Sequence, residues 1–240
     1  MTQHTVIVGG TAGIGLAAAR QLAAAGHQVT VAGRDADRLK RALDEIAGGE
    51  QVQGRVASLT DRASLDALFQ ESGAIDHLVV TAPGTGCPGT LAELDLTTLD
   101  EAFGSKFLGT AHAIQAALPY LAKTGSITLV SAASAQAALP GTAGLGAVNG
   151  AVETLVPTLA LELAPIRVNC VSPGVVDTSW WDRVVPSDQR AGVLDDFTAG
   201  TPAGRAGRPE EIADVIALLV RNGFMTGTVI PVDGGMRLKG

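Results

Sequence analysis

Short apolar runs and longer amphipathic stretches alternate along the chain. Residues 6–8 are apolar and β-branched, end in glycines and lead into an alanine-rich stretch up to Gly26, which predicts a strand, a turn and a helix. Further strands are predicted at about 29–33, 51–57, 75–81, 126–131, 167–171 and 228–232. Helices are predicted from the cap at Asp35 to about 48, from about 60, at about 97–120 and 144–163, and from Pro209, with 177–200 irregular.

This order of elements predicts the fold class. Strands that alternate with helices form a parallel sheet covered by helices on both faces. No linker or internal repeat interrupts the pattern, so residues 1–240 are expected to form one α/β domain with a doubly wound parallel sheet. In such folds the ligand crevice lies at the carboxyl ends of the strands.

Composition narrows the class of protein. Apolar residues make up 46% and charged residues 17% of the 240, which indicates a globular chain. A net charge of −7 argues against a nucleic-acid-binding surface. Two cysteines, Cys87 and Cys170, form no disulfide framework and have no metal-ligand spacing. We find no signal peptide and no membrane span, so we expect a cytoplasmic protein without a metal.

The first turn has the pattern of a phosphate-binding site. Gly9, Thr11, Gly13, Ile14 and Gly15 lie between the first strand and the first helix. Glycines let the backbone approach a pyrophosphate without a Cβ in the way, and the helix start offers unpaired N–H groups to the anion. The turn therefore predicts dinucleotide binding, although an ordinary strand–turn–helix corner remains the alternative.

Four segments resemble the short-chain dehydrogenase/reductase family. The Gly9–Gly15 turn is similar to that family's N-terminal motif, with Val8 where the family usually has threonine. Residues 163–174, 205–213 and 226–235 are similar to its later motifs. The resemblance covers nearly the whole chain and implies a single-domain Rossmann fold, a nicotinamide cofactor and a homotetramer.

The resemblance also implies cofactor contacts. It points to Thr81, Ala82 and Pro83 after the fourth strand, and to Pro173, Gly174 and Val176 after the sixth. At the end of the second strand, an acidic residue would select NAD by binding the ribose 2′-hydroxyl. Gly33 and Arg34 stand there instead, and an arginine fork suits a 2′-phosphate, so NADP(H) is the expected cofactor. A solvated loop arginine is the alternative for Arg34.

The usual catalytic residues of the family are predicted to be replaced. By position, Leu145 stands for the tyrosine, Asn149 for the lysine, Ala132 for the serine and Lys106 for the asparagine. Leucine has no proton to transfer, so another group or a water must do this.

Four residues in this neighbourhood are candidates for the missing chemistry. A buried Lys106 would have a lowered pKa and could donate a proton; the alternative is a structural lysine that binds backbone carbonyls. Ser131 and Ser134 follow the fifth strand, with backbone-satisfying turn residues as the alternative. Asn149 could bind the nicotinamide ribose, or serve packing or a subunit contact.

Two functions are compatible with these residues. The first is an NADP(H)-dependent oxidoreductase, acting on a carbonyl or alcohol with a non-standard proton donor. The second is a catalytically inactive nicotinamide-nucleotide-binding protein, either a sensor or a structural partner. By resemblance, residues 175–200 form a lid, and its Trp180, Trp181 and Phe197 suggest a small-molecule substrate with an apolar portion. Packing of these aromatics within the lid is the alternative. The intact cofactor motifs favour the first function.

Overall fold

One parallel sheet forms the centre of the protein. The computed structural model describes residues 2–46, 49–81, 84, 86–183 and 185–238. Within them, seven strands pair in parallel in the order β3-β2-β1-β4-β5-β6-β7, which confirms the predicted doubly wound α/β fold. The strands are β1 (His4–Val8), β2 (Gln28–Gly33), β3 (Val52–Val56), β4 (Ile75–Val80), β5 (Leu121–Val130), β6 (Arg167–Pro173) and β7 (Val229–Val232).

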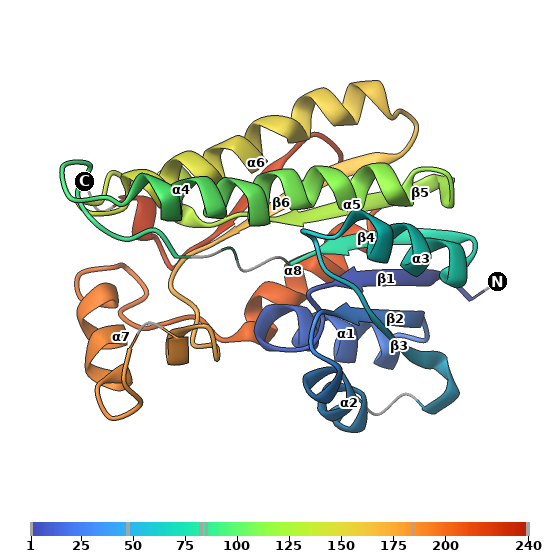
Figure 1. The fold of residues 1–240 in the computed structure, drawn as a ribbon, viewed down its shortest axis with the longest axis horizontal. Helices are drawn as coiled ribbons and strands as arrows, with labels where there is room; N and C mark the ends of the chain where they lie inside the picture. Colours follow the sequence, from blue (N-terminus) through green and yellow to red (C-terminus); the bar gives the residue numbers. More distant parts are fainter. Residues whose placement is uncertain (1, 47–48, 82–83, 85, 184, 239–240) are drawn as a thin grey trace.

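Helices cover both faces of this sheet (Figure 1). One face carries α1 (Gly13–Ala24), α2 (Ala36–Glu45) and α8 (Pro209–Arg221). The other face carries α3 (Arg62–Ser72), α4 (Leu96–Ala102), α5 (Gly109–Ala117) and α6 (Ala143–Glu162). Helix α7 (Arg190–Thr198) lies apart, on the side of the carboxyl ends of the strands.

Alternate side chains of each strand point to opposite faces of the sheet, so the protein has two separate hydrophobic cores. Val6 and Val8 of β1 are buried on one face of the sheet, in the same cluster as Leu65 of α3. Ile7, between them, is buried on the opposite face with Leu22 of α1. Neighbouring side chains of a strand point to opposite faces, so a continuous apolar run is what a sheet buried on both sides requires.

Several predicted helix starts are confirmed in atomic detail. The Asp35 carboxylate accepts a hydrogen bond from the Arg38 backbone N–H at 2.8 Å and caps α2. Asp61 caps α3 in the same way. Pro209 is the first residue of α8, where its missing N–H has no consequence.

Two predicted segments are wrong in detail. The helix expected at 97–120 consists of α4, the π-helix η2 (Phe103–Leu108) and α5, and it ends at Ala117. The segment 177–200, expected to be irregular, contains the short 3₁₀ helix η4 (Trp181–Arg183) and α7. A π-helical turn holds more residues than an α-turn, and Lys106 is the buried residue of η2.

Helix α6 has the length and apolar composition that could cross a membrane, contrary to our expectation that no stretch qualifies. Its Val152 and Val156 are nevertheless buried in the same core cluster as residues of β5 and β6. We therefore interpret its apolar composition as that of a helix packed on the sheet.

Candidate functional site

The Gly-rich turn is packed too tightly for side chains. Gly9 has a φ of +90°, and a Cβ there would lie 2.8 Å from Thr81 Oγ1. A Cβ on Gly15 would lie 2.3 Å from the Gly9 carbonyl oxygen. Thr81 itself donates from Oγ1 to that carbonyl at 3.0 Å, so the end of β4 supports the turn. Only glycine fits at both positions.

The start of α1 is open to an anion. Ala12 is the N-cap and makes no side-chain capping bond, and the first turn, which includes Ile14, carries no acidic residue. A Cβ on Gly13 (φ +51°) would lie 3.1 Å from Thr178 Cγ2 of the segment after β6. Unsatisfied N–H groups at the start of a twelve-residue helix favour phosphate binding.

Gly33 ends β2 and Arg34 follows it, as predicted, but the reason for the glycine differs from our expectation. A Cβ on Gly33 would lie 2.5 Å from Thr11 Cγ2, so the space beside it is filled by Thr11 and is not left open. Arg34 is exposed, and within the described part of the chain its guanidinium has no ion-pair partner.

Sequence analysis missed two further arginines beside this turn. Arg38 and Arg41 of α2 line a cavity of about 400 Å³ together with Thr11, Ala12 and Gly13. Both are exposed, and neither has a carboxylate partner within ion-pair distance among the described residues. Arg38 and Arg41 are three residues apart on the amphipathic helix that follows Arg34, and this spacing, which places both on one side of the helix, could have indicated them.

The segment after β6 lies against the C-terminal strand. Pro173 is in register with Val232 of β7, and a Cβ on Gly174 would lie 2.8 Å from the Asp233 backbone. Val176 is buried and pairs with Gly207 in an isolated bridge. The predicted contacts Ala82 and Pro83 lie outside the described residues.

Lys106 is the buried cation of the site. It lies in the π-helix η2, is 8% exposed and donates from Nζ to the Ser131 carbonyl oxygen at 3.4 Å. Burial lowers the pKa of Lys106 to about 8, against the opposing influence of Cys170 and Glu153. Its proton can therefore be transferred near neutral pH.

Both polar groups of the candidate Ser131 are engaged in hydrogen bonds. Its hydroxyl donates to Glu153 Oε1 at 2.7 Å, and its carbonyl accepts from Lys106. Sequence analysis missed Glu153, although it stands four residues after Asn149 on the same face of α6. The Ser131 hydroxyl also lies 3.4 Å from the Val171 carbonyl, so it contacts both a carboxylate and a backbone group.

Ser134 and Asn149 form a second polar pair. Asn149 donates from Nδ2 to Ser134 Oγ at 3.2 Å and to the Leu145 carbonyl at 2.8 Å. Asn149 is 3% exposed, and its Oδ1 has no hydrogen-bond partner in the part of the chain that the structure describes. A buried acceptor without a donor is rare in folded proteins, so this oxygen points to a ligand or water. Leu145 packs on an apolar cluster that includes Cys87 and Val148.

The aromatic residues of the predicted lid contact one another. The ring centroids of Trp180 and Trp181 are 5.0 Å apart, and those of Trp181 and Phe197 are 5.6 Å apart. Arg190 of α7 binds the Asp177 and Asp182 carboxylates and the Thr178 carbonyl. Packing of the lid on itself therefore accounts for Trp181, whereas Phe197 remains 46% exposed.

Known proteins resemble this chain along nearly its whole length. Residues 9–237 match the family described as enoyl-(acyl carrier protein) reductase. A short-chain dehydrogenase/reductase of Stachybotrys chlorohalonatus is 31% identical, and the alignment covers 99% of this chain and 98% of that protein.

Two solved structures share the fold. A small-chain dehydrogenase in complex with NADPH is 32% identical, with a TM-score of 0.82 over 99% of this chain and all of that one. A short-chain oxidoreductase from Pseudomonas aeruginosa, described as containing an atypical catalytic center, is 28% identical, with a TM-score of 0.88 over 97% of this chain and 96% of that one. The chain belongs to the short-chain dehydrogenase/reductase family of oxidoreductases.

Proposed function

We propose that the protein is an NADP(H)-dependent oxidoreductase that interconverts a carbonyl and an alcohol, with Lys106 as the proton donor and acceptor. The observation that carries this proposal is the buried Lys106 ammonium, 3.4 Å from the Ser131 carbonyl at the carboxyl end of β5. This is the end of a doubly wound sheet where ligands bind.

The described residues fit a nicotinamide dinucleotide. A Cβ at Gly9, Gly13 or Gly15 would lie within 3.1 Å of other atoms of the protein, so these glycines keep the turn tight, and the start of α1 suits the pyrophosphate. Arg34, with Arg38 and Arg41 nearby, would hold a 2′-phosphate. The NADPH bound in the related structure supports the same choice. When bound, the nicotinamide supplies the hydride chemistry.

The remaining proton chemistry falls to residues of this chain. Lys106 Nζ has three N–H groups, and among the described residues it donates one of them to the Ser131 carbonyl, so another would meet the substrate oxygen. During carbonyl reduction a proton moves from Nζ to the substrate oxygen, and during alcohol oxidation it moves from that oxygen back to Nζ. Asn149 Oδ1 would accept a hydrogen bond from the cofactor ribose, and Ser134 orients the amide.

The lid and the assembly complete the proposal. Residues 175–200 would close over a small-molecule substrate, with Phe197 contributing an apolar contact. We propose a homotetramer acting in the cytoplasm.

The test is to titrate the protein with NADPH by fluorescence and then measure NADPH oxidation with a panel of ketones and quinones. We expect saturable binding and slow turnover of at least one carbonyl. If NADPH binds and no carbonyl is reduced, the catalytically inactive binding protein becomes the better account. If NADPH does not bind, both functions fail.

A further inference from the structure

We infer that Glu153 is a positioning residue that fixes the Lys106 ammonium at the carboxyl end of β5, acting through Ser131 between them. The inference rests on the proposed function, in which Lys106 carries the proton. Glu153 lies on α6, one helical turn beyond Asn149, and is half-buried.

The Glu153 carboxylate ties α6 to two neighbouring strands. Its Oε1 accepts the Ser131 hydroxyl at 2.7 Å and the Ser172 hydroxyl at 2.8 Å, and its Oε2 accepts Gln136 Nε2 at 2.9 Å. Ser131 follows β5 and Ser172 belongs to β6, and both serines are buried. Hydrogen bonds to a carboxylate are about twice as strong as neutral ones, so the ends of both strands are held firmly.

Ser131 connects the two charges. Its hydroxyl donates to Glu153, and its carbonyl accepts the Lys106 ammonium at 3.4 Å. No direct ion pair joins Lys106 and Glu153 in the described ranges. The ammonium is therefore placed by a carbonyl whose own residue is anchored, and among the described residues Ser131 is the one hydrogen-bond acceptor of Nζ.

Glu153 is also the anion that keeps Lys106 charged. Burial lowers the pKa of Lys106 to about 8, and the two groups that oppose this effect are Cys170 on β6 and Glu153 on α6. Burial raises the pKa of the Cys170 thiol to about 11, so the thiol is uncharged near neutral pH. Of these two groups Glu153 then supplies the negative potential, and without it the ammonium would lose its proton at lower pH.

The experiment is a titration of the lysine side chains by ¹³C–¹⁵N NMR in the apoprotein. The chain has four lysines, and Lys106→Arg assigns the Lys106 signal. Glu153→Gln removes the charge but can still accept both serine hydroxyls, and the exposed Gln136 amide can turn to match it. Glu162→Gln, at the exposed end of α6, is the matched control.

We expect Glu153→Gln to lower the pKa of Lys106 by about one unit, because a nearby opposite charge shifts a pKa by roughly 1–3 units. Glu162→Gln should leave it unchanged. An unchanged pKa in folded Glu153→Gln protein overturns the inference. Should that variant not fold, Ser131→Ala breaks the connection with the charge retained; an unchanged Lys106 titration and chemical shift would then overturn it.

The same variants separate this inference from the proposed function. The NMR result needs neither cofactor nor substrate, so it stands even if no carbonyl is turned over. Where turnover is found, the rate of carbonyl reduction should decline at a lower pH on the alkaline side in Glu153→Gln, and this shift should equal the change in the pKa of Lys106.

Discussion

Acid pH should destabilise the folded protein through His77. His77 lies on β4, is 2% exposed and shares a hydrogen bond of 2.8 Å with Ser126 Oγ through Nδ1. Its Nε2 has no partner among the residues described. Burial lowers the pKa of His77 to about 4; His27 and Arg167 act in the same direction, and Asp76 opposes them.

The size of this effect follows from the two pKa values. The unfolded chain binds the proton with the ordinary pKa of 6.5 and therefore takes it up first as the pH falls. The stabilisation is fully present above about pH 6.5 and is lost as the pH falls towards 4. Between about pH 7.5 and about pH 5 the loss is about 2 kcal/mol of the free energy of unfolding. Burial lowers the pKa of His4 and His27 as well, so they add to the loss.

Urea denaturation at these two pH values, at one protein concentration and ionic strength, measures the loss. In His77→Gln the free energy of unfolding should fall by about 2 kcal/mol less between these two pH values, because glutamine does not titrate. His112→Gln removes a histidine of α5 that is not among His4, His27 and His77, and serves as the control. If native protein and His77→Gln lose the same free energy of unfolding on acidification, His77 is not the group responsible.

Three further predictions concern the cofactor and the assembly. Gly13→Val should abolish NADPH binding in folded protein, because its side chain meets Thr178 and the bound pyrophosphate; unchanged fluorescence titration would place the site elsewhere. NADPH should bind roughly tenfold to a hundredfold more tightly than NADH, since a charge-assisted contact contributes ~1.5–3 kcal/mol, and Arg34→Ala should remove most of this preference. Equal affinities in native protein would contradict the assignment. Sedimentation at micromolar concentration should give a tetramer of the 24.3 kDa chain, and only a monomer would refute it.

Local patterns were sufficient to predict most of the fold. The β-branched run of β1 and the caps at Asp35 and Asp61 act within a few residues of themselves, so periodicity and capping rules identify them. The π-helix η2 has no such local pattern. Helix α7 was missed because its apolar residues form no clear stripe along its length.

The candidate site depends on contacts that periodicity cannot describe. Position and the resemblance indicated Lys106 and Asn149, and both are buried near the carboxyl ends of the strands. Glu153 escaped notice because its partners, Ser131, Gln136 and Ser172, are 17 to 22 residues away in the chain. The reason for glycine at position 33 depends on a side chain from another turn.

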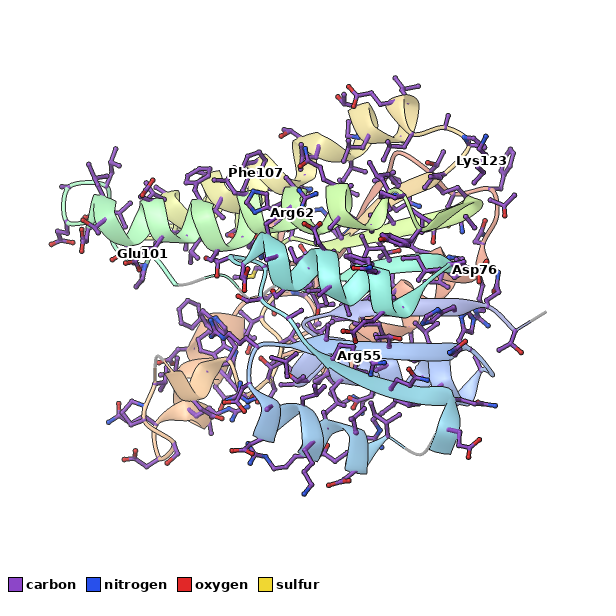
Figure 2. All side chains as sticks on the ribbon, turned by 45° about the vertical axis from the view of Figure 1, so that its right-hand side comes forward. Arg55, Arg62, Asp76, Glu101, Phe107 and Lys123 are labelled. Carbon is purple, nitrogen blue, oxygen red and sulfur yellow. The ribbon has the colours of Figure 1, made fainter. Side chains whose placement is uncertain are left out.

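The central claim is that Lys106 donates and accepts the proton, and Lys106→Met tests it most directly. Methionine keeps the apolar stem that packs in η2 and removes the proton. The measurement is the kcat of NADPH-dependent carbonyl reduction together with the Kd of NADPH, with Lys123→Met, at the exposed start of β5, as the control (Figure 2). We predict a loss of ~10²–10⁴ in kcat with nearly unchanged Kd for Lys106→Met, and no loss for Lys123→Met. Turnover that survives in Lys106→Met would show that the lysine is structural.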